Sequence, residues 1–166
     1  MIPRISKILY ATDLSKNSAY AFRYAVNTAE KHNAKITILY VLAPSRFVVE
    51  LDFLTDEARM FANAEQTQAD KIKGRLEGVI QKEQKDRPES LANRIAGIEI
   101  LEGDPADTIM QKAEDMNADV LIMGTHSKGL IAQAFLGSVA SQVLQQIRIP
   151  VFIIPIPKET DIAFND

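Results

Sequence analysis

The chain of 166 residues contains no cysteine and only two histidines. Without cysteine it forms no disulfide, no iron–sulfur cluster and no Cys-based zinc site, and it has no thiol to use as a nucleophile. Two histidines are also too few for a three-histidine metal site. A chain of this length buries roughly 70% of its unfolded surface without such cross-links. The composition therefore predicts a single domain held together by its own core.

The sequence also lacks a strong excess of charge and a long apolar run. Its 19 basic and 22 acidic residues leave a formal net charge of −3, which provides no general attraction to nucleic acid or to an anionic membrane. The longest apolar segment, residues 149–156, is much shorter than the ~20 residues of a membrane helix and contains two prolines. The N-terminus has no apolar core followed by a small-residue cleavage site. We therefore expect a soluble, cytoplasmic protein with neither nucleic acid nor membrane as a partner.

Two patterns alternate along the chain. Short segments rich in β-branched residues are typical of strands that are covered on both faces. The expected strands are Ile5–Tyr10, Ala34–Val41, Ile95–Leu101, Asp119–Met123 and Pro150–Ile154. Helical periodicity is expected between them, over Ser15–His32, Thr55 to about Asp86, a segment capped by Asp104, and about Gly137–Gln146. This order predicts parallel strands joined by right-handed crossovers, which is an α/β, doubly wound, three-layer sandwich.

The helical periodicity also predicts which side chains face the core. In the first helix these are Ala19, Phe22, Tyr24, Ala25, Val26 and Ala29, with Ser15 as the cap. In the last helix they are Val139, Val143, Leu144 and Ile147. Asp104 followed by Pro105 is the clearest helix start in the chain, and Gly103 turns the chain out of the preceding strand.

In an open parallel sheet, ligands bind at the carboxyl ends of the strands. Three of the seven glycines lie in the fourteen residues 124–137, between the fourth strand and the last helix. At the start of that helix, the amides of Gly137, Ser138 and Val139 are expected to offer unpaired donors to an anion. The Ser138 hydroxyl would add a donor and Lys128 a positive charge. These features predict a phosphate-binding loop.

Several well-known motifs are absent. The chain has neither GxxxxGK[ST] nor GxGxxG, so it carries neither a P-loop nor a dinucleotide-binding fingerprint. Ser127 lies in a GxxSxG arrangement, which is one residue too long for the nucleophile elbow GxSxG. The phosphate-binding loop therefore belongs to another class.

Two segments of the chain carry a resemblance to a known family: residues 8–15, ILYATDLS, and residues 118–126, ADVLIMGTH. The first resembles the first strand and acidic turn of the universal stress proteins, and the second resembles their fourth strand. The chain resembles this family over nearly its whole length. ATP-binding members carry a glycine, two residues, a second glycine, nine residues, and then a glycine and a hydroxyl residue. Gly124, Ser127 and Gly137-Ser138 stand at those positions with the spacing intact. Ser127 replaces the second glycine, and Ala11 replaces a frequent proline.

The resemblance implies a fold and a site. It implies a five-stranded sheet of order 3-2-1-4-5, a single domain over residues 1–157 and a flexible tail over residues 158–166. It implies that Asp13 approaches the ribose, that the Val41 backbone bonds to adenine, and that residues around Gly124 and Gly137 hold the phosphates. The expected binding residues are Ala11, Thr12, Asp13, Val41, Met123, Gly124, Ser127, Lys128, Gly129, Gly137, Ser138 and Val139. The implied cofactor is ATP, or ADP or AMP, with Mg²⁺ at the phosphates, and the implied assembly is a homodimer through Val151–Ile154.

Three functions follow as alternatives. The first is a regulatory switch that binds ATP, acts through protein partners and at most hydrolyses ATP slowly. The second is a dimeric interaction module that binds no nucleotide, because the side chain of Ser127 crowds the phosphates. The third is an adenylate-forming enzyme, although the turn at residues 11–15 lacks the glycines of such a phosphate loop. Asp13 has a second interpretation as a brace for the first helix, and the segment Ala43–Leu54 is the expected mobile loop.

Overall fold

The structure, a computed structural model, describes residues 2–15, 18–44, 55–86, 91–125 and 136–155, with the backbone alone described over 55–67. The elements in chain order are β1 (Lys7–Ala11), α1 (Ser18–His32), β2 (Lys35–Leu42), α2 (Thr55–Asp86), β3 (Ile95–Glu102), α4 (Pro105–Asp115), β4 (Val120–Gly124), α5 (Ser138–Gln146) and β5 (Val151–Ile154). The predicted alternation of strands and helices is therefore confirmed. Part of the expected loop, residues 45–54, and the expected tail lie outside the described residues.

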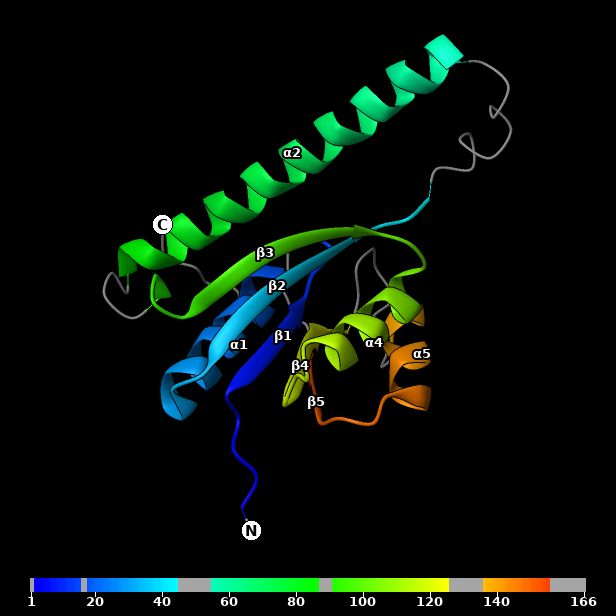
Figure 1. The fold of residues 1–166 in the computed structure, drawn as a ribbon. Coiled ribbons are helices and arrows are strands. Elements are labelled where there is room, and N and C mark those ends of the chain that lie inside the picture. Colours follow the sequence, from blue (N-terminus) through cyan, green and yellow to red (C-terminus); the bar gives the residue numbers. More distant parts are fainter. Residues whose placement is uncertain (1, 16–17, 45–54, 87–90, 126–135, 156–166) are drawn as a thin grey trace.

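The five strands form one parallel sheet of order β3-β2-β1-β4-β5 (Figure 1). The central strand β1 pairs with β2 on one side, where Ile8 lies opposite Ile36, and with β4 on the other, where Ile8 lies opposite Val120. The chain reverses its direction of winding between β1 and β4, so the crevice of a doubly wound sheet is expected between these two strands. The predicted fold and strand order are confirmed.

Both faces of the sheet are covered, which explains the continuous apolar runs of the strands. On one face Ile8 and Tyr10 of β1 pack in a core with α1 and α2. On the other face Leu9 and Ala11 pack with α4 and α5. Figure 1 shows α4 and α5 together on one side of the sheet, with α2 crossing the opposite side.

Helix α1 is described from Ser18, and the Ser15 carbonyl oxygen accepts a hydrogen bond from the Ser18 amide. Residues 16 and 17 lie outside the described residues, so the expected cap at Ser15 stays a prediction. Two other expectations about the helices are wrong. Tyr24 is 45% exposed and Leu144 is 42% exposed. Tyr24 is adjacent in the sequence to the buried Ala25, and Leu144 is adjacent to the buried Val143. One residue corresponds to a rotation of about 100° around the helix axis, which is enough to turn a side chain from the core toward solvent. The apolar stripe is therefore narrower than its composition suggests, and in α1 it includes the buried Ala21, which the periodicity did not place in the core.

The predicted start of α4 is confirmed. The Asp104 carboxylate accepts a hydrogen bond from the Asp107 amide at 3.1 Å, and Pro105 occupies the first turn. Gly103 precedes this cap with φ +151°, and a Cβ there would lie 2.5 Å from the hydroxyl oxygen of Thr108. Glycine is thus required at 103 both by the backbone and by its neighbour.

Helix α2 is by far the longest element, with 32 residues. Its C-terminal part lies on the sheet, where Ile72 and Leu76 are buried, whereas its N-terminal part stands away from the sheet (Figure 1). Arg23 of α1 pairs with the buried Glu83 of α2 at 2.9 Å. No helix in the described part of the chain is long and apolar enough to cross a membrane.

Candidate functional site

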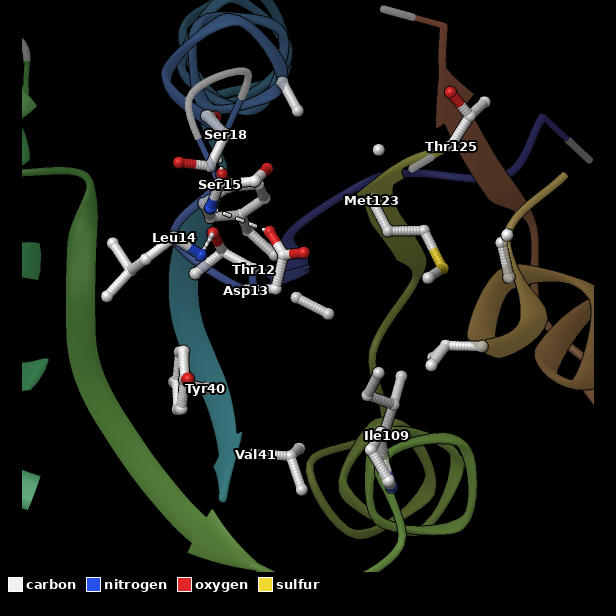
Figure 2. Close-up of a pocket in the computed structure, with 18 of the residues that line it drawn as sticks. Thr12, Asp13, Leu14, Ser15, Ser18, Tyr40, Val41, Ile109, Met123 and Thr125 are labelled. Carbon is white, nitrogen blue, oxygen red and sulfur yellow. Dashed lines mark hydrogen bonds between the residues drawn. The ribbon is translucent and has the colours of Figure 1, made fainter. Parts of the chain in front are cut away.

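A cleft of about 550 Å³ opens at the carboxyl ends of β1, β2 and β4 (Figure 2). It brings together nine of the twelve expected binding residues. They are Ala11, Thr12, Asp13, Val41, Met123, Gly124, Gly137, Ser138 and Val139. The other three, Ser127, Lys128 and Gly129, lie outside the described residues. The volume is within the range of about 300–1,000 Å³ that is typical of small-molecule sites.

One end of the cleft is the acidic turn, residues 12–15, which follows β1. Its side chains satisfy its own backbone: the Leu14 amide donates to the Thr12 hydroxyl at 3.1 Å, and the Ser15 amide donates to Asp13 Oδ1 at 2.9 Å. Asp13 therefore does brace the turn. Its side chain is nevertheless exposed and points toward the Met123 side of the cleft, while Leu14 points the other way (Figure 2). Bracing and ligand contact are thus compatible at Asp13.

Tyr10 is a buried residue of β1 that lies next to the acidic turn. Its hydroxyl donates to the Ser18 carbonyl oxygen at 2.7 Å, and its ring packs on Phe22 with the centroids 5.4 Å apart. Burial raises the pKa of the Tyr10 phenol well above its usual range, and the nearby Asp13 carboxylate raises it further, against a lowering by the Thr12 hydroxyl. Tyr10 is therefore a neutral hydrogen-bond donor at physiological pH.

The floor of the cleft is apolar. Its residues come from β2, α4 and β4 and include Leu39, Ile109 and Met123, all of which are buried. Such a surface suits a flat apolar group such as a purine ring. Pro105 and Ile109 were not among the expected site residues. Both residues belong to α4, which follows directly after the carboxyl end of β3. The rule that ligands bind at the carboxyl ends of parallel strands, applied to β3, would have predicted them.

The backbone of Val41 faces the cleft. Leu39 accepts a hydrogen bond from the Thr12 amide, which follows the last paired residue of β1, so the Leu39 carbonyl points toward β1. The backbone polar groups of a strand alternate in direction, and Val41 therefore points the same way as Leu39. Because β1 ends at Ala11, opposite Leu39, Val41 has no β1 residue beside it. Its amide and carbonyl are placed to bond to a ligand.

The other end of the cleft is the start of α5. The expectation of a free Gly137 amide is wrong, because that amide donates to the Thr125 carbonyl at 2.8 Å. This bond fixes the start of α5 against the end of β4. Gly137 is the N-cap and makes no side-chain cap bond, and the first-turn amides of Ser138, Val139 and Ala140 donate to no acceptor in the part of the chain that the structure describes. All three residues line the cleft, so the donors for an anion lie one residue later than expected.

Gly124 lies between the two ends. A Cβ built on it would find its nearest described neighbour, the Ile154 carbonyl oxygen, at 3.9 Å, which is an ordinary contact. Its φ is also outside the range that favours glycine. Neither the backbone nor the described neighbours therefore require glycine here. A ligand that approaches the backbone closely would require it.

The described lining of the cleft contains one carboxylate, Asp13, and no lysine, arginine or histidine. Among the described residues, no group of three histidine or acidic side chains is placed to hold a metal ion. The contacts that this part of the cleft offers are backbone amides, hydroxyls, the Asp13 carboxylate and an apolar floor. These suit binding of a polar small molecule with a flat apolar part.

The fold and the cleft define an open, doubly wound α/β protein with a ligand site at its point of chain reversal. The family model described as the universal stress protein family matches residues 4–155, and the chain belongs to that family. The resemblance seen in the sequence is confirmed.

Individual relatives agree with this assignment. Universal stress protein MJ0531 of Methanocaldococcus jannaschii is 32% identical over 153 residues, which cover 92% of this chain and 84% of that protein. The universal stress protein UspA from Lactobacillus plantarum has a similar structure, with a TM-score of 0.68, 25% identity and coverage of 91% and 98% of the two chains. A universal stress protein solved in complex with cAMP shares the fold, with a TM-score of 0.54, 24% identity and coverage of 93% and 99%.

Proposed function

We propose that this chain binds an adenine nucleotide in the cleft and that the bound nucleotide acts as a regulatory signal in a stress response. The observation that carries the proposal is the arrangement of one cleft of about 550 Å³, with an apolar floor, a carboxylate at one end and the first-turn amides of α5 at the other. These three environments match the base, the ribose and the phosphates of a nucleotide. A family member of the same fold in complex with cAMP supports the choice of an adenine nucleotide.

The proposed orientation follows from the contacts available. Adenine lies on the floor beside Ile109 and bonds to the backbone of Val41. The Asp13 carboxylate accepts from the ribose hydroxyls. The phosphates lie at Gly124 and at the amides of Ser138 and Val139, with Ser127, Lys128 and Gly129 completing the loop. ATP is the proposed ligand, with ADP and AMP as alternatives, and Mg²⁺ accompanies the phosphates.

A binding role fits this cleft better than a catalytic one. Asp13, the carboxylate of the described lining, already accepts a hydrogen bond from the Ser15 amide. A general base must reach the water that it activates, and Asp13 lies at the ribose end of the proposed orientation. We therefore propose that any ATP hydrolysis is slow and that the nucleotide acts by changing how protein partners bind.

An adenylate-forming enzyme is disfavoured by the same turn. Such an enzyme would use backbone amides after β1 to hold phosphates. Here the amides of Leu14 and Ser15 donate to the side chains of Thr12 and Asp13. They are already engaged before any ligand arrives.

Two measurements test nucleotide binding. The purified protein is denatured and its supernatant is analysed by mass spectrometry for adenine nucleotides. A fluorescent ATP analogue is then titrated, and displacement is measured with ATP, ADP, AMP and cAMP and, for comparison, with GTP. We expect saturable binding that adenine nucleotides displace and guanine nucleotides do not. Absence of saturable binding at millimolar nucleotide would overturn the proposal.

The alternative function, an interaction module without nucleotide, rests on Ser127, which stands where ATP-binding members carry glycine. If its side chain crowds the phosphates, Ser127→Gly creates or tightens ATP binding. If the parent protein already binds ATP and Ser127→Gly leaves the affinity unchanged, the crowding hypothesis is wrong.

We also propose that the protein forms a homodimer through Val151–Ile154. Strand β5 is at the edge of the sheet and pairs with β4 on one side, and Phe152 is 39% exposed. Exposed apolar edges are normally covered or paired. Sedimentation at micromolar concentration is expected to give the mass of a dimer, and a monomeric mass would contradict this assembly.

A further inference from the structure

Leu14, in the acidic turn, has an unfavourable backbone conformation. The described residues other than glycine with positive φ are Leu14 at +57°, Asn33 at +56° and Asn117 at +50°. Asparagine adopts this left-handed conformation readily, whereas leucine does not. A conformation of this kind persists only when the surrounding structure imposes it, and it is often found at functional sites. The contacts that impose it on Leu14 are therefore informative.

The first such contact comes from α2, sixty-one residues away in the sequence. Arg75 Nη2 donates to the Leu14 carbonyl oxygen at 3.3 Å. The Leu14 amide donates to the Thr12 hydroxyl in the other direction. Both backbone groups of Leu14 are thus held, one from within the turn and one from α2.

The second contact is apolar. The Leu14 side chain packs against the core between the sheet and α2. With Leu76, Val79 and Ile80 of α2, it lines a separate cavity of about 10 Å³ behind the turn. A void of this size holds about one water molecule. The back of the acidic turn therefore rests on α2 with little space between them.

Helix α2 itself does not line the cleft in the described part of the chain. It is held to the body by the buried side chains Ile72 and Leu76 and by the ion pair between Arg23 and Glu83. Among the residues that the structure describes, the contact that connects Arg75 to the lining of the cleft is its hydrogen bond to Leu14. We therefore expect Arg75 to affect a ligand through the acidic turn, apart from the long-range effect of its positive charge.

We propose that Arg75 is a positioning residue for the cleft. It holds Leu14 in the left-handed conformation, and this conformation directs the neighbouring Asp13 carboxylate toward the ligand while Leu14 points toward α2. The inference rests on the proposed nucleotide site for its effect on affinity, but the effect on the turn is independent of any ligand. Because coupling between sites is reciprocal, a ligand on Asp13 stabilises the contact between the turn and α2.

Adenosine is the best probe of this inference, since it is uncharged and does not respond to the loss of a distant positive charge. Arg75→Met keeps the apolar stem and removes the donor. We expect it to weaken adenosine binding about three- to tenfold, the effect of losing one hydrogen bond. Lys73→Met is the matched control, because it removes the same charge from an exposed position on the same helix, and it is expected to leave the affinity unchanged. Arg75→Lys, which restores a donor, is expected to recover most of the affinity.

A double-mutant cycle separates positioning from other effects. If Arg75 acts through Asp13, Arg75→Met has little further effect on adenosine binding in an Asp13→Ala background. Additive losses would show that Arg75 acts by another route and would overturn the inference.

Amide hydrogen exchange of the ligand-free protein gives the decisive readout. We expect faster exchange at Leu14 and Ser15 in Arg75→Met than in the parent or in Lys73→Met. With adenosine bound to the parent, we expect slower exchange over residues 72–80. If the parent binds no adenosine, the proposed function fails, and the exchange of the ligand-free turn still decides whether Arg75 positions it. Unchanged exchange at both amides in Arg75→Met overturns the inference.

Discussion

The two ends of the cleft are built by different means. At the acidic turn, side chains do most of the bonding: Thr12 and Asp13 accept from the backbone, and Arg75 of α2 donates to it. At the start of α5, two bonds run between backbone groups, from the Gly137 amide to the Thr125 carbonyl and from the Ser141 amide to the Gly137 carbonyl, and the Ser141 hydroxyl adds a bond to the Leu136 carbonyl. One end presents a charged side chain to the ligand, and the other presents the amides of a helix terminus.

This difference determines how each end responds to substitution. The acidic turn depends on the identity of its side chains, so even a conservative change there alters the site. The start of α5 depends on the course of the chain, and most side chains at Ser138 would leave its amides in place. At that end only added charge or added bulk is expected to matter. Four substitutions test this contrast.

The largest effect is expected at the phosphate end, from Ser138→Glu. A carboxylate in the first turn stabilises a helix by about 0.3–1 kcal/mol but repels phosphate. We therefore expect ATP affinity to fall at least about tenfold while adenosine affinity and thermal stability are maintained. Calorimetric titration with ATP and with adenosine measures the two affinities in the parent and in the variant. Ser138→Gln, which adds similar bulk without charge, is the control, and equal losses of ATP binding in both variants would contradict an anion site.

The second effect is on stability, at the acidic end. Tyr10→Phe removes the hydrogen bond to the Ser18 carbonyl, and we expect a loss of about 1 kcal/mol in the free energy of unfolding near pH 7. The folded state keeps the Tyr10 proton at a pH where the unfolded chain, with a tyrosine pKa of about 10, releases it. Above about pH 10 the unfolded state therefore binds fewer protons than the folded state. The contribution of the neutral Tyr10 phenol to the free energy of unfolding is complete below about pH 10, and it declines as the pH rises above that value.

Phenylalanine has no such proton, and the difference between parent and Tyr10→Phe should therefore narrow from pH 9 to pH 11. Urea unfolding at each pH measures it. A difference that stays constant over this range would show that burial does not hold the phenol in its neutral form.

A smaller effect is expected from Asp13→Asn, which distinguishes the two roles of Asp13. The amide oxygen of asparagine still accepts from the Ser15 amide, so the turn is kept while the charge is lost. We expect adenosine binding to weaken about three- to fivefold, because a hydrogen bond to a charged acceptor is stronger than one to a neutral acceptor. Titration of adenosine measures the change. Unchanged affinity would mean that Asp13 only braces the turn.

The smallest effect is expected from Gly124→Ala. The structure has room for the added methyl group, so the free energy of unfolding should change by less than about 0.5 kcal/mol. If phosphate approaches this backbone, ATP affinity should fall about two- to threefold. Gly103→Ala is the contrasting variant, since its methyl group would lie 2.5 Å from the Thr108 hydroxyl oxygen. We expect that variant to lose stability and to keep its ATP affinity. The opposite pattern in the two variants would refute the proposed role of Gly124.

Much of the fold could be predicted because its signals are local. The strands are continuous apolar runs, and the start of α4 is marked by Asp104 and Pro105, which lie within one turn of the bond that they form. The edge of the sheet that holds the site follows from the order of elements alone. Nine of the expected residues line one cleft for that reason.

The wrong predictions concern residues whose role depends on a partner that is distant in the sequence. Tyr24 and Leu144 are apolar and lie next to buried positions, but the width of the buried stripe depends on what packs against it. The Gly137 amide is at a helix start, where free donors are normal, yet the Thr125 carbonyl takes it. Neither outcome is visible without the positions of the partners.

The sequence by itself determined the order of elements, the parallel sheet, the edge that carries the site and the family to which the chain belongs, because periodicity and short motifs act over a few residues. Only the tertiary structure decided that the Gly137 amide is taken by the Thr125 carbonyl and that the Ala140 amide joins those of Ser138 and Val139 as a donor at that edge. It alone also showed that Leu14 has a positive φ and that Arg75 of α2 donates a hydrogen bond to its carbonyl oxygen. Such contacts join residues far apart in the chain, and their existence depends on how the layers pack.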